Sequence, residues 1–480
     1  MYSNWIAVGF IMATAAGFVL AGEPPLPLGL GVPSPVPAEP SLPAGLAAPA
    51  QPPSEPALPS GLDAPDAAPV GLAERPSRLL PEELSGFWEA RGGVRTQNDP
   101  HEKSASLGET RLQLQYDQSG ERAAVKVVAD FLYDPVLNEH NVDLEEGDGW
   151  LDVRQANLLL RPASFMDVKL GRQINTWGTG DLLFINDLFP KDWNAFFIGR
   201  DDEYLKAPSD AVKTALFGEW ANLDIVYTPR FDSDRSIDGR RLTFWDSARG
   251  RRVGRDAEVD FDKPDDTFSD DEWATRLYRN VGAYEAAAYA YDVFWKSPGG
   301  MDPRTGEATY PRLQVFGASV RGPLGKGILS LEGGWYRSAE DLAGDDPYVR
   351  NSEGRYLVGY EQELMQNLTG GVQYYVENML DYGAYRRTLP EGITAADEYR
   401  QVVAVRLTKL LLSQNLRVGV FVYYSPTDKD AYLRPNANYK IDDHWIAEVG
   451  GNVFVGEDDH TFFGQFERNN NVYASVRYGF

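Results

Sequence analysis

Alternation of apolar and polar residues with a period of two is the feature that most limits how this chain folds. At the carboxyl end, Val472, Ala474, Val476, Tyr478 and Phe480 share one face of an extended strand, with polar or small residues between them. A strand turns successive side chains to opposite faces, and about ten residues cross a bilayer when tilted. A soluble sandwich alternates too, so one segment alone is weak evidence, but many such segments together favour a closed barrel, because a sheet in lipid must pair every backbone group. The sequence therefore predicts an all-β fold, a closed antiparallel transmembrane β-barrel over residues 85–480.

The alternating segments predict about eighteen strands, with sixteen as an alternative count. An even number is expected when both ends of a single-chain barrel lie in the periplasm. The count depends on dividing residues 273–295 at the turn around Asn280. The predicted strands are 85–96, 107–117, 121–133, 151–161, 165–173, 211–219, 222–230, 272–279, 283–295, 311–320, 327–337, 354–362, 367–378, 398–409, 413–424, 430–440, 444–455 and 471–480.

The amino terminus has the features of a secretory signal peptide over residues 1–21. An apolar run from Trp5 to Leu20 is shorter than the roughly 20 residues of a membrane-spanning helix, and small residues follow it. We expect cleavage between Ala21 and Gly22. Because no Lys or Arg precedes the run, an uncleaved anchor is the alternative.

Residues 22–84 form a Pro- and Ala-rich segment with an internal repeat. Repeat units begin at Glu23, Glu39 and Glu55, sixteen residues apart. This composition has too few apolar residues for a core and too much proline for a helix, so we expect a disordered, polyproline-like periplasmic linker. Residues 23–65 could dock to a periplasmic partner through their Leu-Pro pairs, and a simple tether is the alternative.

Composition argues against several classes of function. The chain has no cysteine, which excludes disulfides and thiolate metal sites, and its net charge of −25 argues against a nucleic-acid partner. Its four histidines fall in predicted loops or turns, and no Gly-x-Ser-x-Gly motif is present. We therefore expect no catalytic residue, no metal site and no cofactor.

The predicted loop from Ile174 to Asp210 is unusually apolar for a segment between strands. Water-exposed loops rarely carry so much aromatic surface, so we expect this loop to fold inward and narrow the pore. Asp181 is expected to start a short helix that Pro190 follows. The alternative is a loop that caps the barrel mouth or lies at the membrane interface. The candidate constriction residues are Trp177, Asp181, Phe184, Phe189, Trp193 and Phe197.

Charged residues opposite the apolar face of each strand are expected to line the lumen. The predicted basic wall contains Arg91, Arg95, Arg111, Lys126, Arg400, Arg406, Arg417, Arg434, Lys440 and Arg477. The predicted acidic wall contains Glu219, Asp224, Glu285, Glu332, Glu361 and Glu377. Facing walls of opposite sign would create a transverse field that suits anionic or zwitterionic solutes. The alternative is local neutralisation, in which Glu89, Asp117, Asp130 and Glu448 pair within the basic wall.

Two further features indicate partners in the membrane. Tyr478 and Phe480 at the carboxyl end have the form of a signal to the barrel assembly machinery. A basic stretch from Arg235 to Arg255 precedes an acidic run from Asp256 to Glu272. The basic stretch could contact lipopolysaccharide phosphates among the outer-membrane lipid, or it could pair with the acidic run.

Short motifs give a family resemblance. The stretch Val168–Gln173, which ends in Gly-Arg-Gln before the long loop, resembles porins and barrels of the alginate-export type. The fuller string over 171–178 and the ending from Gly464 to Phe480 are similar to a poorly characterised family of proteobacterial outer-membrane barrels. The resemblance implies the barrel fold and a place in the Gram-negative outer membrane, and it implies neither a substrate nor a catalytic residue.

The predicted function is a porin-like outer-membrane channel for passive diffusion of small polar solutes, with anions or zwitterions preferred. A partner-dependent export or lipid-trafficking component, whose Pro-rich repeat docks periplasmic machinery, is one alternative. A structural barrel plugged by its loops is the other.

Overall fold

The computed structural model describes residues 81, 83–137, 140–180, 183–246, 249–259, 261–389 and 395–480. The expected signal peptide, the repeats and nearly all of the expected linker lie outside these residues. Within the described part of the chain, every helix is too short or too polar to cross a bilayer.

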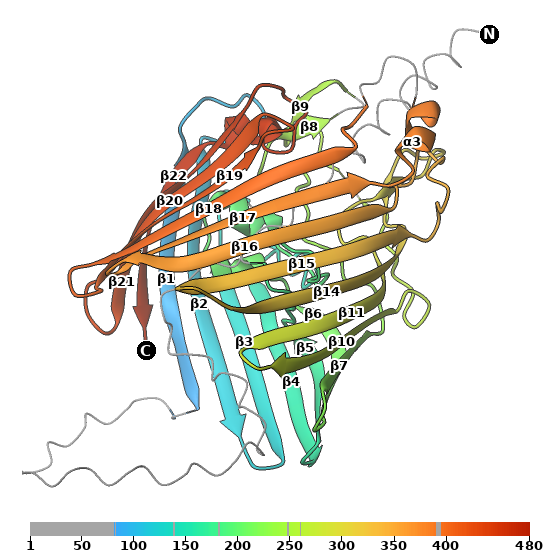
Figure 1. Ribbon diagram of the computed structural model, residues 1–480. Helices are drawn as coiled ribbons and strands as arrows, with labels where there is room; N and C mark the ends of the chain where they lie inside the picture. Colours follow the sequence, from blue (N-terminus) through green and yellow to red (C-terminus); the bar gives the residue numbers. More distant parts are fainter. Residues whose placement is uncertain are drawn as a thin grey trace, which may run out of the picture.

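Eighteen antiparallel strands form a single sheet that closes on itself (Figure 1). Each strand pairs with the next one along the sheet, and the last strand pairs with the first from Phe87↔Gly479 to Arg95↔Asn471. The strands are β1 Leu84–Arg95, β2 Ala105–Ser119, β3 Ala123–Tyr133, β4 Leu151–Ala163, β5 Met166–Gln173, β6 Ser209–Phe217, β7 Asn222–Thr228, β10 Glu272–Val281, β11 Tyr284–Phe294, β14 Arg312–Leu324, β15 Gly327–Ser338, β16 Glu353–Met365, β17 Leu368–Met379, β18 Tyr399–Leu411, β19 Leu416–Ser425, β20 Asp430–Lys440, β21 Trp445–Gly456 and β22 Asn471–Gly479. The predicted closed barrel of eighteen strands is confirmed.

Strand boundaries agree with the alternation to within a few residues. The division near Asn280 is confirmed, because β10 ends at Val281 and β11 begins at Tyr284. One boundary error affects a predicted site residue. Strand β6 ends at Phe217, so Glu219 lies in the exposed turn before β7 and is not part of a lumen wall. The prediction extended β6 too far because it counted the turn as alternating strand.

The barrel exposes apolar side chains on its outer face. On β22, Val472 is 50 % exposed, whereas the neighbouring Tyr473 is 4 % exposed on the inner face. Val449 on β21 and Val358 on β16 are exposed in the same way. A soluble protein would bury such residues, whereas a lipid-facing barrel wall presents them outward. The outer surface is therefore suited to a bilayer.

The two ends of the barrel differ. At the short-turn end, strands join through turns of a few residues, and both chain ends of the barrel lie there because Gly86 and Phe480 exchange backbone hydrogen bonds. At the long-connection end the links are mostly long, although β19 and β20 are joined by only residues 426–429. The long links contain β8 Phe244–Asp246, β9 Arg251–Val253, β12 Gly300–Met301, β13 Ala308–Thr309, α3 Tyr382–Thr388 and η2 Gly464–Asn469, none of which was predicted.

The basic stretch in the β7–β10 connection pairs with acidic residues of neighbouring connections. Arg252 lies 3.1 Å from Glu467, and Arg255 lies 3.0 Å from Glu102. Arg251 pairs with Asp256, the first residue of the acidic run, at 2.8 Å. Of the two interpretations of this stretch, ion pairing within the protein is the one that the contacts favour.

Candidate functional site

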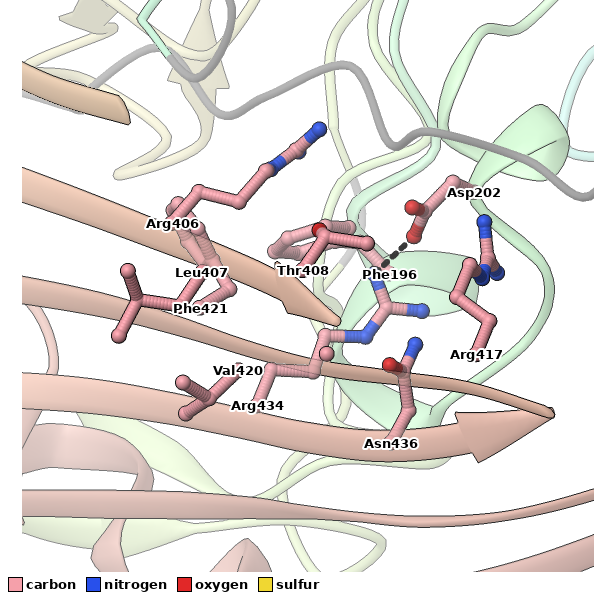
Figure 2. Close-up of a pocket in the computed structure, with 11 residues that line it drawn as sticks. Phe196, Asp202, Arg406, Leu407, Thr408, Arg417, Val420, Phe421, Arg434 and Asn436 are labelled. Atoms are coloured by element: carbon pink, nitrogen blue, oxygen red, sulfur yellow. Dashed lines mark hydrogen bonds and ion pairs between the residues drawn. The ribbon is translucent and has the colours of Figure 1, made fainter. Parts of the chain in front are cut away.

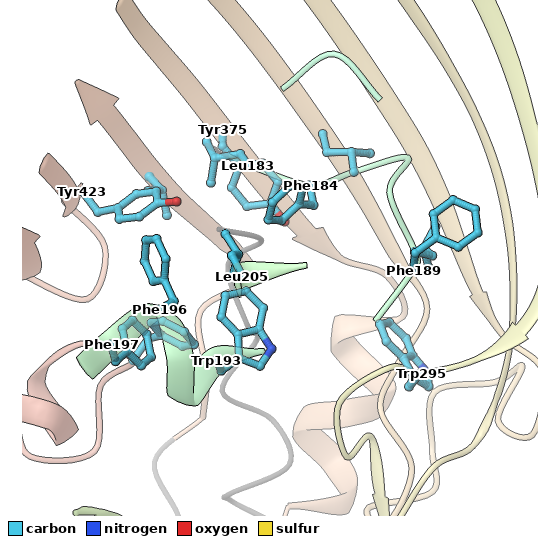
Figure 3. Packing of buried hydrophobic residues seen from close by; sticks show 14 of the residues in the cluster. Leu183, Phe184, Phe189, Trp193, Phe196, Phe197, Leu205, Trp295, Tyr375 and Tyr423 are labelled. Carbon is cyan, nitrogen blue, oxygen red and sulfur yellow. The ribbon is translucent and has the colours of Figure 1, made fainter. Parts of the chain in front are cut away.

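The β5–β6 connection, residues 174–208, runs inside the barrel (Figure 1). Its aromatic side chains and those of the inner wall form one buried core, part of which Figure 3 shows. Phe197, for example, packs edge-on against Tyr432 of β20 with ring centroids 5.5 Å apart. The candidate constriction residues Trp177, Phe184, Phe189, Trp193 and Phe197 all belong to this core. Asp181 lies outside the described residues.

The short helix in this connection is not where the sequence predicted it. Helix α2, Trp193–Ile198, follows Pro190 instead of preceding it. Asp192 caps its amino end by accepting a hydrogen bond from the Ala195 N–H at 2.7 Å. Gly199, with φ of 87°, ends it in the left-handed conformation that glycine adopts without strain. The prediction chose the wrong aspartate as the cap.

Glu332 of β15 anchors the first half of the connection to the wall. Its carboxylate, almost fully buried, accepts hydrogen bonds from the backbone N–H groups of Thr179 at 2.9 Å, Gly180 at 2.9 Å and Asn186 at 2.7 Å. The side chains of Thr179 and Asn186 donate two more. Glu332 therefore acts as an acceptor that orders the loop backbone, and not as a free charge of an acidic wall.

The second half of the connection is anchored on the other side of the lumen. Arg91 of β1 donates to the carbonyl of Gly199 at 2.6 Å, and Arg434 of β20 donates to the carbonyl of Arg200 at 2.7 Å. Strands β1 and β15 lie eight strands apart by the shorter way round the eighteen-stranded ring. The connection therefore crosses the lumen from one wall to nearly the opposite one.

Arg235, in the β7–β10 connection, joins the β5–β6 connection to the β3–β4 connection. We call the connections at the long-connection end, other than β5–β6, the outer links. Its buried guanidinium lies 3.0 Å from Asp152 of β4 and 3.4 Å from Asp192, the cap of α2. It also donates to the carbonyl of Glu145 at 3.0 Å. Burial by itself would lower the pKa of Arg235, but the two carboxylates outweigh it and raise that pKa. The guanidinium is thus a charged link between three segments.

The predicted basic-wall residues lie on the inner faces of their strands, with Lys440 at the exposed short-turn rim. Many of them are neutralised locally. Glu89 pairs with Arg91 at 3.0 Å and with Arg477 at 2.9 Å, and Glu448 also pairs with Arg91. Arg111 and Lys126 likewise pair with Asp130 and Asp117. These contacts favour local neutralisation over a field between opposite walls.

The remaining acidic-wall residues also face the lumen, and most have cationic partners. Asp224 lies 3.6 Å from Lys213, and Glu285 lies 2.6 Å from Arg276. Glu377 lies 3.4 Å from Arg350. Glu361 instead lines a cavity described below.

A recurring sequence signal for local neutralisation was missed. An acidic residue two positions before an arginine places both on the same face of a strand. Glu109 and Arg111 pair in this way at 2.7 Å, as do Glu353 and Arg355 at 2.8 Å. Glu89 and Arg91 follow the same spacing. The Glu-x-Arg spacing was visible in the sequence before any register was known.

On the short-turn side of the β5–β6 connection, a cavity of about 460 Å³ lies against strands β18, β19 and β20 (Figure 2). Phe196 and Asp202 of the connection form one side. Arg434, which is ion-paired with Asp202, lines the other side together with Arg406 and Arg417. In the part of the chain that the structure describes, the guanidinium of Arg417 has no ion pair or hydrogen bond. A cationic group thus remains available to a solute.

Two more cavities flank the connection. One, of about 390 Å³, shares Arg406 with the first and is also lined by Arg321 and Glu361. The other, of about 520 Å³, lies towards the long-connection end and is lined by Phe184, Trp295, Arg350 and Arg355 among others. The lumen therefore holds open space above and below the segment that crosses it.

Apolar side chains separate these two flanking cavities. Along the inner face of β16, Leu357 lies between Arg355 of the upper cavity and Gly359 of the lower one. Leu357, Leu183 of the crossing connection and Tyr375 of β17 are all buried. We call these three side chains the apolar neck. Leu183 and Tyr375 both belong to the buried core, and both are labelled in Figure 3.

Comparisons with known proteins add little beyond the general fold. No protein-family model and no curated protein matches the chain. Among solved structures, OccD3 (OpdP) of Pseudomonas aeruginosa is 10 % identical over 83 % of this chain and 91 % of its own, with a TM-score of 0.47. OccAB1 of Acinetobacter baumannii is 10 % identical over 83 % and 96 %, with a TM-score of 0.46. Salmonella typhi OmpF, in a complex with daunomycin, is 11 % identical over 83 % and 97 %, with a TM-score of 0.40.

Proposed function

We propose that this chain is a porin-like channel through which small anionic solutes diffuse passively across the outer membrane. The observation that carries the proposal is the arginine-lined cavity of Figure 2, which lies inside a lipid-facing barrel and contains Arg417, a cation without a described protein partner. A buried or half-buried charge without a partner is costly in a stable protein. An unpaired Arg417 in the lumen is explained if anions that pass through the channel act as its partner.

The preference for anions follows from charge placement and the low-dielectric wall. A cleft lined by one sign of charge focuses its field and raises the local concentration of the opposite ion. Arginine contributes a planar fork of donors that matches carboxylate and phosphate groups. Zwitterions could enter by their anionic end. The strongly acidic total of −25 does not oppose this proposal, because it is the charge within the lumen that an ion in transit meets.

In this proposal the apolar neck formed by Leu183, Leu357 and Tyr375 is the narrowest point. Apolar constrictions in channels resist wetting and so hold back ions until the gap widens. Small movements of the β5–β6 connection would then control conduction. The channel would conduct weakly, in brief openings, compared with a barrel whose lumen is unobstructed.

For cellular placement, we infer that the barrel lies in a Gram-negative outer membrane with its short-turn end in the periplasm. Bacterial barrels carry short turns on the periplasmic side and longer loops outside. Residues 22–84 would then start in the periplasm, Tyr478 and Phe480 would be presented to the assembly machinery, and the long connections would meet lipopolysaccharide.

Single-channel recording in planar bilayers tests the proposal. In a KCl gradient, we expect a reversal potential that indicates preference for chloride over potassium. Arg417→Gln should weaken that preference, because it removes an unpaired cation from the cavity. Arg304→Gln is the matched control, since the Arg304 side chain is 84 % exposed in the β11–β14 connection. Cation selectivity, or selectivity that Arg417→Gln leaves unchanged, would contradict the proposal.

A plugged structural barrel is the second candidate, and a specific observation favours it. The β5–β6 connection packs its aromatic residues into one core with the wall and is anchored at both sides of the lumen. A barrel of this kind would insert into bilayers without conducting. Absence of current from the wild type, together with current after deletion of residues 176–206, would favour the plug.

A further inference from the structure

Two lysines face each other directly on the inner wall of the barrel. Lys169 of β5 and Lys213 of β6 are cross-strand partners in the antiparallel register. Residues directly opposite in such a pair have Cβ atoms about 4.5–5.5 Å apart, so both side chains leave the sheet at nearly the same point. Neither β5 nor β6 contributed a residue to the predicted basic wall. The sequence could not reveal this pair because it depends on register.

Both lysines point into the lumen. Lys213 lies 3.6 Å from Asp224, a buried residue of the inner face of β7, and its partner on β7 in the register is the buried Val226. Lys169 shares this face because it is paired with Lys213. Its sequence neighbours Val168 and Leu170 belong to the outward apolar face. The two ammonium groups therefore lie on the water-filled side.

Acidic residues of the protein neutralise the charges of Lys169 and Lys213 only in part. Lys213 has one carboxylate at ion-pair distance, Asp224. Lys126 of β3, two strands from Lys169, lies 3.8 Å from Asp117. The positive charges of Lys126 and Lys213 both repel the ammonium group of Lys169. Within the described ranges, the ammonium group of Lys169 has no hydrogen bond and no acidic partner. Like charges directly opposite each other destabilise a sheet.

We propose that Lys169 and Lys213 form a binding site for a small oxyanion of the phosphate class. An oxyanion between the two ammonium groups would supply the charge that the protein does not provide. Lysine binds phosphate as a compact point charge with freely rotating donors, whereas planar carboxylates are matched better by arginine. The role of this site in transport rests on the proposed channel function.

The position of the pair in the barrel supports a role in transit. Strand β18, which carries Arg406, lies nine strands from β5 in the closed ring of eighteen, and β19, which carries Arg417, lies nine from β6. The lysine pair and the arginine-lined cavity therefore lie on opposite walls. Lys169 is the fourth residue from the short-turn end of its strand, and Arg417 is the second of its own. An anion in the short-turn half would be drawn to cations on both walls.

Binding is tested on the detergent-solubilised wild type and on Lys169→Gln/Lys213→Gln, with inorganic phosphate titrated by calorimetry. We expect saturable binding by the wild type and binding that is roughly 10-fold weaker or lost in the double variant. Lys326→Gln, in the exposed β14–β15 turn, should bind like the wild type. The double variant removes the like-charge repulsion but also the ion pair of Lys213 with the buried Asp224, so heat-dependent gel mobility checks that it folds. Lys169→Gln alone is the second variant.

Block of chloride current by phosphate gives the second readout. The wild type should show concentration-dependent block, and the double variant should show less. Equal phosphate binding by the wild type and the double variant, or no saturable binding by the wild type, would overturn the site. A wild type that binds phosphate through these lysines but carries no current would retain the site and overturn the channel. A wild type that conducts anions without saturable phosphate binding would overturn the site and retain the channel.

Discussion

Replacing Glu332 by alanine removes the acceptor that holds the first half of the β5–β6 connection against the wall. Three backbone N–H groups, those of Thr179, Gly180 and Asn186, donate to this one carboxylate at 2.7–2.9 Å. In Glu332→Ala these groups would lose a charged acceptor inside the barrel. We expect the segment around residues 176–189 to detach from β15 while the strands themselves remain paired.

The size of the effect follows from the number of bonds. A hydrogen bond to a charged group contributes about 1.5–3 kcal/mol, so the three backbone bonds and the two side-chain bonds from Thr179 and Asn186 set an upper limit of about 15 kcal/mol. The carboxylate loses hydration when it is buried, and the freed segment can relax and take up water. We therefore expect a loss of about 3–5 kcal/mol, the usual cost of breaking a buried charged interaction. This changes the ratio of detached to anchored loop by roughly 10²–10⁴-fold.

Amide hydrogen exchange in the purified barrel measures this ratio directly. Exchange at Thr179, Gly180 and Asn186 should accelerate by roughly the same factor in Glu332→Ala, because exchange reports local opening. In planar bilayers the variant should show larger and longer openings, since the apolar neck includes Leu183 of the same segment. The exchange rates and channel openings of Glu332→Gln should lie between those of the wild type and of Glu332→Ala. The amide oxygen of the glutamine can still accept a hydrogen bond, whereas its NH₂ group opposes the donors.

Glu361→Gln is the matched control. Glu361 is an acidic residue on the inner face of the adjacent strand β16, and it lines the lower cavity without a described hydrogen bond to the connection. Its removal changes the lumen charge by the same amount as Glu332→Gln. Unchanged exchange at residues 176–189 in Glu332→Ala would refute the anchoring role. Equal acceleration in Glu361→Gln would show that charge, and not the hydrogen bonds, is responsible.

Three further predictions concern other parts of the barrel. Arg235→Met should lower the stability of the long-connection end by about 3–5 kcal/mol, because the buried Asp192 loses its cation and Asp152 keeps only Arg154 at 3.9 Å, and faster proteolysis of the outer links would report it. Burial raises the pKa of Asp148 to about 6 despite the nearby arginine, so its contribution to stability is complete below the unfolded pKa of about 4 and is lost as the pH rises through about 6. The outer links should accordingly resist protease better at pH 5 than at pH 7.5, and Asp148→Asn should flatten this dependence. Gly199→Ala should slow assembly of the barrel or loosen α2, because an added Cβ would meet the ring of Tyr473 and the φ of 87° disfavours alanine, as heat-dependent gel mobility would show.

Period-two alternation was sufficient to predict the barrel because the fold imposes it on every strand. Lipid outside and water inside require the alternation, and even the turn near Asn280 was placed within a residue or two. The error at Glu219 arose where alternation is uninformative, in the turn of residues 218–221, whose first three residues are all exposed. Strand ends are set by hydrogen bonding and not by polarity alone.

The site was harder to predict because its chemistry depends on register. The aromatic content of residues 174–210 pointed to an inward loop, but it gave no indication that Glu332 would cradle the backbone of that loop. Which cation meets which anion was equally hidden wherever partners come from different strands, as with Lys169 and Lys213. Only the Glu-x-Arg spacing within one strand, as in Glu109 and Arg111, was open to sequence reasoning.

The Glu-x-Arg pairs and the cations without a described acidic partner lie at different positions along the barrel axis. Glu-x-Arg pairs such as Glu353 and Arg355 lie towards the long-connection half, where the crossing connection is packed and anchored. Cations without a described acidic partner, Lys169 and Arg417, lie towards the short-turn half. Charges that serve the fold must be neutralised, because an unpaired buried charge is costly, whereas charges that serve passing ions must not be. The short-turn half also holds paired cations, such as Lys126 with Asp117 and Arg276 with Glu285, so in our proposal it is the unpaired Lys169 and Arg417, and not the whole half, that serve the solute.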